Sequence, residues 1–200
     1  LKFRLARVKQ EHLESTAEAV DLYREILLLL PEHDGARGQL ENLLDDPSHG
    51  KAAAEILEPM YETSGQWENL IRALEVLVVG ADDPEEKLRL LTKVGQVAAG
   101  PLDNAARSFD AYMRALREVP SHADTMAQLE VLAIEQDRFE ELVKLVVELA
   151  ANETDPVLAR SLYLKAAEHY ATQLGNMDGA VGCYNKILES DPSDEEVLAS

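Results

Sequence analysis

Residues 180–192 read AVGCYNKILESDP, and the chain writes nearly the same stretch twice more, as AVDLYREILLLLP at 19–31 and SFDAYMRALREVP at 108–120. In each copy a small residue stands four positions before a tyrosine, an apolar pair follows, and a proline closes the stretch. Residues at this spacing share one face of an α-helix, which the proline then ends. The repeat-defining residues are Ala19, Tyr23, Pro31, Ser108, Tyr112, Pro120, Ala180, Tyr184 and Pro192.

The repetition extends beyond this motif at a constant offset of 72 residues, which separates its second and third prolines. Trp67 aligns with Phe139, and the Asp-Pro pair at 83–84 aligns with the pair at 155–156. Asp followed by Pro is typical of a helix start, because the carboxylate caps free amides and proline fits the first turn. Strand-type alternation is absent. The predicted helices span 1–13, 15–30, 34–45, 49–63, 67–79, 84–99, 103–118, 122–135, 138–151, 156–172 and 177–190, with a last one beginning at 193.

These helices predict an all-α protein in which about 11–12 helices stack as antiparallel hairpins in one α-solenoid. The predicted parts are a partial first repeat at 1–48, full repeats at 49–120 and 121–192, and the start of a further helix at 193–200. The first repeat is irregular, because 89 residues rather than 72 separate the first two motif prolines. We attribute the difference to an extra helix near 34–63, which either bends the stack or caps a gap.

The motif resembles the second helix of a tetratricopeptide (TPR) repeat, in which small, aromatic, small or apolar, and proline positions follow at these intervals. In 156–192 the resemblance extends into the first helix, where Tyr163, Ala167 and Tyr170 stand near the expected aromatic, small and aromatic positions. It covers about half of the chain, because the hairpins at 49–80 and 121–151 do not follow the pattern. The resemblance, to degenerate TPR-like arrays of long bacterial proteins, implies a non-catalytic scaffold that binds a protein or peptide.

The resemblance also implies that first helices line a concave binding surface. The side chains expected there are Arg89, Thr92 and Gln96 in one hairpin and Ser161, Leu164 and Glu168 in another; an ordinary solvated face is the alternative. The sequence lacks the Lys/Asn cluster with which some TPR modules bind an acidic peptide terminus. Together with the net charge of −19, this favours a basic partner over an acidic one and argues against nucleic acid. Such binding should weaken as salt rises.

No catalytic or metal-binding motif is recognisable, so we predict no catalytic residue, no metal site and no cofactor. The five histidines, at 12, 33, 49, 122 and 169, show no helical metal-ligand spacing. His33, His122 and Asp194 each stand two residues after a motif proline and are predicted to be turn residues. Glu168 and His169 are predicted to lie on an exposed helix face rather than to act as acid and base.

The apolar residues raise two further expectations. Cys183, the single cysteine, is predicted to be a small buried residue. The apolar run Ile26–Leu30 is predicted to be buried; if its outer face is bare, it is a partner or dimer patch. No apolar run approaches the roughly 20 residues needed to span a bilayer.

Two functional alternatives remain beside the binding scaffold. One is a structural spacer or self-assembly segment of a large protein, which would make the chain a homo-oligomer. The other is a regulatory subunit of an enzyme. Because the sequence begins with Leu1 rather than Met and its end reads as an interrupted helix, we expect it to be a fragment. The lack of a visible signal peptide favours a cytoplasmic location.

Overall fold

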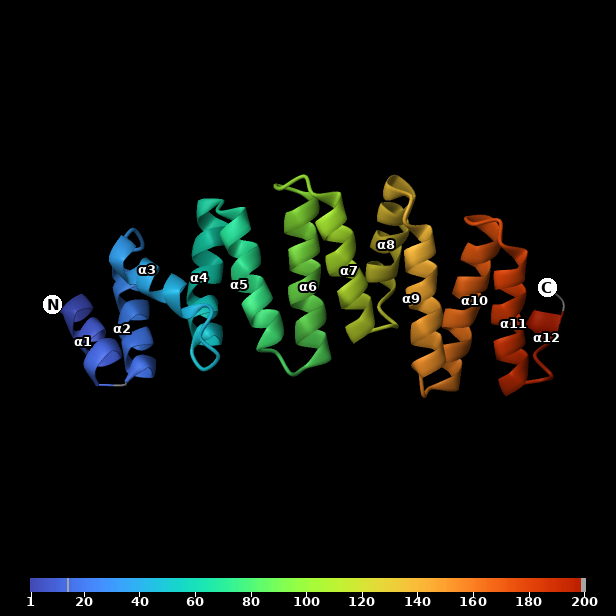
Figure 1. Cartoon of the computed structure of the whole chain (residues 1–200), viewed down its shortest axis with the longest axis horizontal. Helices are drawn as coiled ribbons and strands as arrows, with labels where there is room; N and C mark the ends of the chain where they lie inside the picture. The colour runs from blue at the N-terminus through green and yellow to red at the C-terminus, as the bar shows by residue number, and fades with distance from the viewer. Residues whose placement is uncertain (14, 199–200) are drawn as a thin grey trace. The chain divides into compact units, whose positions relative to one another are not determined.

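The computed structural model describes residues 1–13 and 15–198, which form helices without a strand (Figure 1). The twelve helices of this described part are α1 (Lys2–His12), α2 (Thr16–Leu29), α3 (Asp34–Leu43), α4 (Gly50–Ser64), α5 (Trp67–Val79), α6 (Pro84–Ala99), α7 (Ala105–Glu118), α8 (Ala123–Gln136), α9 (Phe139–Asn152), α10 (Pro156–Thr172), α11 (Met177–Ser190) and α12 (Glu195–Leu198). The all-α prediction is confirmed, and the described helix ends lie within about two residues of those predicted, inside the usual uncertainty of helix boundaries.

The helix ends follow the residues that predict them. Asp83 and Asp155 are the N-caps of α6 and α10, and their carboxylates accept hydrogen bonds from backbone amides at 3.2 and 2.9 Å. A proline follows each cap at the first helical position, where its missing N–H costs nothing. The motif helices α2, α7 and α11 each end two residues before their proline.

The second residue after each motif proline caps the next helix. Nδ1 of His33 and of His122 accepts a hydrogen bond from the amide three residues later, at 3.0 and 3.3 Å. The carboxylate of Asp194 accepts the equivalent bond from Val197, at 3.1 Å. The prediction of turn residues is therefore confirmed, and their role is to satisfy a free amide at a helix N-terminus.

The chain divides into two compact units: unit 1, Leu1–Asn104, holds α1–α6, and unit 2, which begins at Ala105, holds α7–α12. The boundary falls inside the repeat predicted at 49–120. In unit 1, α1 packs on α2, α4 on α5, and α5 on α6, while α3 contacts both α2 and α4 (Figure 1). In unit 2 each helix packs on the next from α7 to α12. Neighbours in the sequence are thus neighbours within each unit.

Turn geometry recurs at the offset of 72 residues. Gly65 after α4 and Asp137 after α8 both have left-handed backbone, with φ of 68° and 55°. The turns after α6 and α10 repeat this pairing, with φ of 49° at Asp103 and 59° at Gly175. Because left-handed backbone is uncommon outside glycine, its recurrence at equivalent positions supports a structural repeat.

The motif residues pack as their types suggest. The small residues Ala19, Ser108 and Ala180 are buried, as are Tyr23 and Tyr112, while Tyr184 is half-buried. A small side chain lets two helices approach closely, and a ring fills the remaining space. The hydroxyl of Tyr23 donates a 2.8 Å hydrogen bond to Oε1 of Gln10 on α1, which satisfies its polar end.

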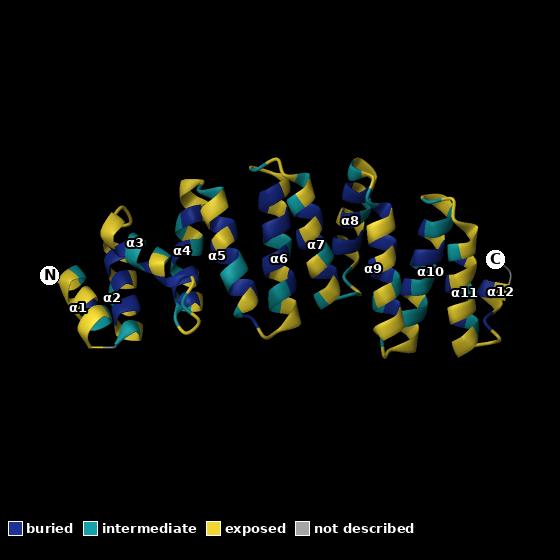
Figure 2. Cartoon of the chain, in the orientation of Figure 1, coloured by how far each residue is buried: buried dark blue, intermediate teal, exposed yellow. Residues whose placement is uncertain are grey.

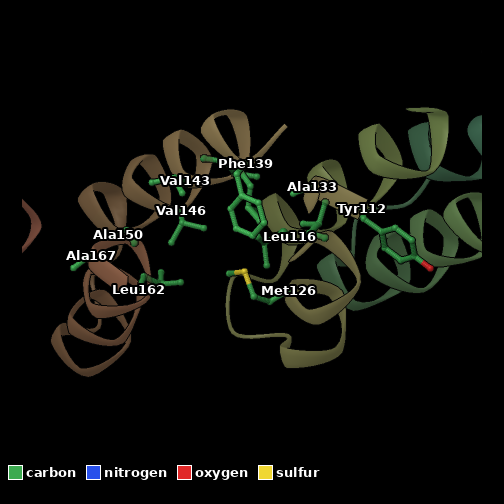
Figure 3. Packing of buried hydrophobic residues seen from close by; sticks show 14 of the residues in the cluster. Tyr112, Leu116, Met126, Ala133, Phe139, Val143, Val146, Ala150, Leu162 and Ala167 are labelled. Atoms are coloured by element: carbon green, nitrogen blue, oxygen red, sulfur yellow. The ribbon is translucent and has the colours of Figure 1, made fainter. Parts of the chain in front are cut away.

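Each helix buries one stripe and leaves the opposite stripe exposed (Figure 2). In unit 2 one apolar cluster joins Leu116 of α7, Met126 of α8, Phe139 of α9 and Leu162 of α10 (Figure 3). Cys183 belongs to this cluster, as predicted, and burial raises the pKa of its thiol. No described helix has the length and apolar character to cross a bilayer.

The run Ile26–Leu30 corrects one expectation. Ile26 and Leu27 are buried, but Leu28, Leu29 and Leu30 have exposed fractions of 77%, 73% and 60%. Five consecutive residues turn through more than one full turn of helix, so a single packed face cannot cover them all. The prediction of burial is wrong for the last three leucines, which leave a bare apolar end on α2.

Candidate binding groove

A groove of about 580 Å³ opens on unit 2 between the start of α8 and the face of α10. Buried Met126 and Leu162 and half-buried Leu158 give it apolar walls, while polar side chains complete the lining. The lining residues of this α8/α10 groove are Pro120, Ser121, His122, Ala123, Met126, Leu158, Ser161, Leu162, Leu164, Lys165, Glu168, Tyr184 and Glu196. A mainly apolar hollow with a few polar groups is the usual form of a ligand-binding site.

The predicted surface residues fall into two groups. Ser161, Leu164 and Glu168 all line the α8/α10 groove. Arg89, Thr92 and Gln96 lie in unit 1, on α6.

The local fold of α10 explains the first group. Asp155 and Pro156 fix the helix start, so residues 161, 164, 165 and 168 recur at the spacing of one helix face. The intervening Leu162 and Ala166 are buried against the rest of unit 2. One face of α10 therefore builds the core and the adjoining face builds the groove.

On α6 the predicted residues have a different setting. Arg89 and Gln96 are exposed, whereas Thr92 is half-buried. The Oγ1 atom of Thr92 is buried and has no hydrogen-bond partner among the described residues. Next to it, Lys93 Nζ reaches Glu58 Oε1 at 2.5 Å and Glu62 Oε2 at 2.7 Å, both on α4.

The same ion pair occurs in unit 2, where Lys165 Nζ lies 2.9 Å from Glu130 Oε1. Both its lysine and its glutamate stand 72 residues after Lys93 and Glu58. The pair connects the first helices of successive hairpins, α4 to α6 and α8 to α10. The sequence analysis missed these four residues, although the constant offset that aligned the aromatics would also have aligned them.

Lys165 sets the charge within the groove. Besides Glu130, its Nζ lies 4.0 Å from Oε2 of the exposed Glu168, so one cation is shared by two carboxylates. In unit 1 the arrangement is similar: burial alone would lower the pKa of Lys93, but the hydrogen bonds to Glu58 and Glu62 outweigh it and raise that pKa. Each lysine is therefore held in its charged form beside an excess of carboxylate.

His169 corrects a second expectation. Glu168 is exposed as predicted, but His169 is only 5% exposed and its ring meets the ring of Phe139 edge-on at 5.2 Å. Its Nε2 lies 3.1 Å from Glu130 Oε1 without the angle of a directed hydrogen bond. Its equivalent 72 residues earlier is the buried Val97, and this alignment would have predicted burial.

The buried histidine does not form a reactive centre with Glu130. Desolvation by burial lowers the pKa of His169, and the opposing charge of Glu130 does not overcome it. A neutral, enclosed imidazole lacking an aligned partner cannot pass a proton to a bound molecule. Among the described residues, no three His, Cys, Asp or Glu side chains converge as metal ligands would. What the groove offers is an apolar floor, hydroxyl and carboxylate groups, and a shared lysine.

Comparison of the sequence with protein-family models and with curated proteins gives no match.

Proposed function

We propose that the chain is a non-catalytic, TPR-like α-solenoid scaffold that binds a segment of another protein in the α8/α10 groove. The observation that carries the proposal is the meeting of Ser161, Leu164 and Glu168 in one open groove. These residues were selected by their repeat position, independently of the groove. Side-by-side hairpins with recurrent turns and a recurrent Lys–Glu pair further support a repeat scaffold.

The chemistry of the groove favours a partner with apolar anchors and basic flanks. The walls formed by Met126, Leu158 and Leu162 can take one or two apolar side chains. Glu168 is exposed and shares Lys165 with Glu130, so the groove keeps unneutralised negative charge. The net charge of −19 adds long-range attraction for cations.

The test is a selection of random peptides on the immobilised full chain, followed by affinity measurements on the selected sequences. Leu164→Glu places a charge in the groove, and we expect it to weaken the selected peptides at least tenfold. Val181→Glu is the matched control, because Val181 is an exposed apolar residue of unit 2 that does not line the groove. It should leave affinity unchanged, and circular dichroism should show that both variants remain helical.

The salt response distinguishes the partner chemistry. Raising NaCl from about 0.05 to about 0.5 M should weaken the selected peptides, since screening removes the attraction between basic flanks and the acidic chain. Selected peptides that bind Leu164→Glu as tightly as the wild type would refute the groove. Acidic peptides held equally at both salt concentrations would refute the proposed partner.

A self-assembly segment is the second candidate, and the bare leucines at 28–30 favour it. Exposed apolar residues of this kind are common where protein chains associate. Light scattering over a concentration series measures this directly. A mass that stays monomeric across the series rules this candidate out, whereas a rising mass supports it.

A further inference from the structure

A second groove lies in unit 1 between α2 and α4, with a volume of about 410 Å³. Its lining is mainly apolar and comes from Leu27, Leu28, Ile56, Pro59 and Met60. Leu28 is 77% exposed, and the bare Leu29 and Leu30 continue the apolar surface beyond it. This α2/α4 groove belongs to a different unit from the α8/α10 groove, and nothing in the repeat motif predicts it.

The spacing of the lining residues suits a helix as the occupant. Residues 24, 27 and 28 on α2 stand at intervals of three and four, as do residues 55, 56, 59 and 60 on α4. Two helices with such parallel rows of side chains form a furrow that accepts the apolar ridge of a third helix. Within unit 1, α3 contacts both walls but contributes none of the lining residues of this groove.

Pro59 adds a polar feature to this furrow. It lies inside α4 and has no N–H, so it cannot donate the usual helical hydrogen bond to the carbonyl of Glu55. Pro59 and Glu55 both line the groove. A donor on an incoming segment can take the place of the missing N–H.

The charges around the groove favour a cationic occupant. Glu55 lines it, and Glu32 lines an adjoining groove that shares Pro59 and Met60. Across the described residues, neither Glu32 nor Glu55 has a hydrogen-bond or ion-pair partner. The one cation in the furrow, Arg24, already has Asp21 at 3.5 Å.

The same charges argue against a second copy of the chain as occupant. Two copies would bring two molecules of net charge −19 together and place equal carboxylates face to face. A lysine- or arginine-bearing helix would instead give Glu32 and Glu55 the partners they lack. We therefore propose that the α2/α4 groove docks a basic amphipathic helix of another protein, apolar face inward.

The probe for the test is a synthetic helix of about 18 residues with leucines on one face and lysines on the other. The full chain is labelled at the methyl groups of its four methionines, Met60, Met113, Met126 and Met177. Met60 lines the α2/α4 groove and Met126 lines the α8/α10 groove, so one NMR titration reports on both sites. We expect the Met60 signal to shift with saturation at one peptide per chain. A titration that shifts Met126 alone, or that leaves Met60 unchanged, overturns the proposal.

Matched variants separate docking from general charge attraction. Leu28→Glu should weaken the peptide at least tenfold, whereas Val79→Glu should not, because Val79 is equally exposed in unit 1 but lies outside the groove. Glu55→Lys should weaken it several-fold more than Glu85→Lys, the same charge change on α6. Equal effects within either pair would mean non-specific attraction and overturn the proposal.

Two further outcomes identify the occupant. A peptide with glutamates in place of its lysines should lose binding, and retained binding would overturn the basic partner. Sedimentation without peptide should show a monomer. A dimer that Leu28→Glu dissociates would instead make a second copy of the chain the occupant. Because Met126 and Leu164 report on the other groove, either proposal can fail while the other survives.

Discussion

The left-handed turns offer a quantitative test of the repeat, because equivalent positions hold different residues. At Gly65 an added Cβ would meet nothing closer than 3.8 Å, where the ring of Trp67 lies. The cost of Gly65→Ala is therefore conformational rather than steric. Left-handed backbone costs a residue with a Cβ about 1–2 kcal/mol, and the lower entropy of unfolded alanine offsets part of this. We expect Gly65→Ala to lower the free energy of unfolding by about 1 kcal/mol.

The equivalent change in unit 2 should have the opposite sign. Asp137→Gly removes a Cβ from the same turn, where φ is 55°. Asp tolerates left-handed backbone better than most residues, so the expected gain in stability is smaller, about 0.5 kcal/mol. Gly38→Ala is the matched control for unit 1: it lies inside α3 with no atom within 4 Å of the added Cβ, and should stabilise by about 0.5–1 kcal/mol.

Urea unfolding measures all three variants. Trp67 is the single tryptophan, so its fluorescence reports on unit 1, while circular dichroism follows both units. The midpoint should fall for Gly65→Ala and rise for Gly38→Ala and Asp137→Gly, with unchanged slopes. The reasoning is refuted if Gly65→Ala and Gly38→Ala shift the midpoint in the same direction, since only the backbone conformation distinguishes them.

Three further outcomes follow from single contacts. The hydrogen bonds from Arg160, followed by that from the Val197 amide, lower the pKa of Asp194 to about 2. Its contribution to holding α12 should thus be present above about pH 4, the unfolded value, and be lost as pH falls through 2; carboxyl NMR that gives an ordinary pKa would contradict this. Ser108→Ala removes a buried hydroxyl that has no partner among the described residues, and should be neutral or stabilise by up to about 1 kcal/mol. A double-mutant cycle between Lys93 and Glu58, both about one-fifth exposed, should give a coupling of about 1 kcal/mol; a coupling near zero would deny the pair a structural role.

The helix plan could be predicted because short-range chemistry determines it. Asp83 and Pro84 start a helix through local capping, and each motif proline ends one through a local clash. The constant offset then assigned helix faces well enough to bring Ser161, Leu164 and Glu168 to one groove.

What the sequence did not reveal depends on the neighbours of each residue. His169 is buried because Phe139 and Glu130 approach it from other helices, while polar residues are mostly exposed. Leu28 is exposed because no helix covers that side of the end of α2, which an apolar run alone cannot show. The Lys93–Glu58 pair required knowledge of which helices are adjacent.

Photo-crosslinking at position 164 tests the central claim most directly. A photoreactive phenylalanine analogue in place of Leu164 lies in the α8/α10 groove, and the same analogue in place of Val181 lies outside it. A basic peptide selected on the wild-type chain should crosslink at position 164 and not at position 181. Crosslinking at 181 alone, or equally at both positions, would contradict a scaffold that binds its partner in this groove.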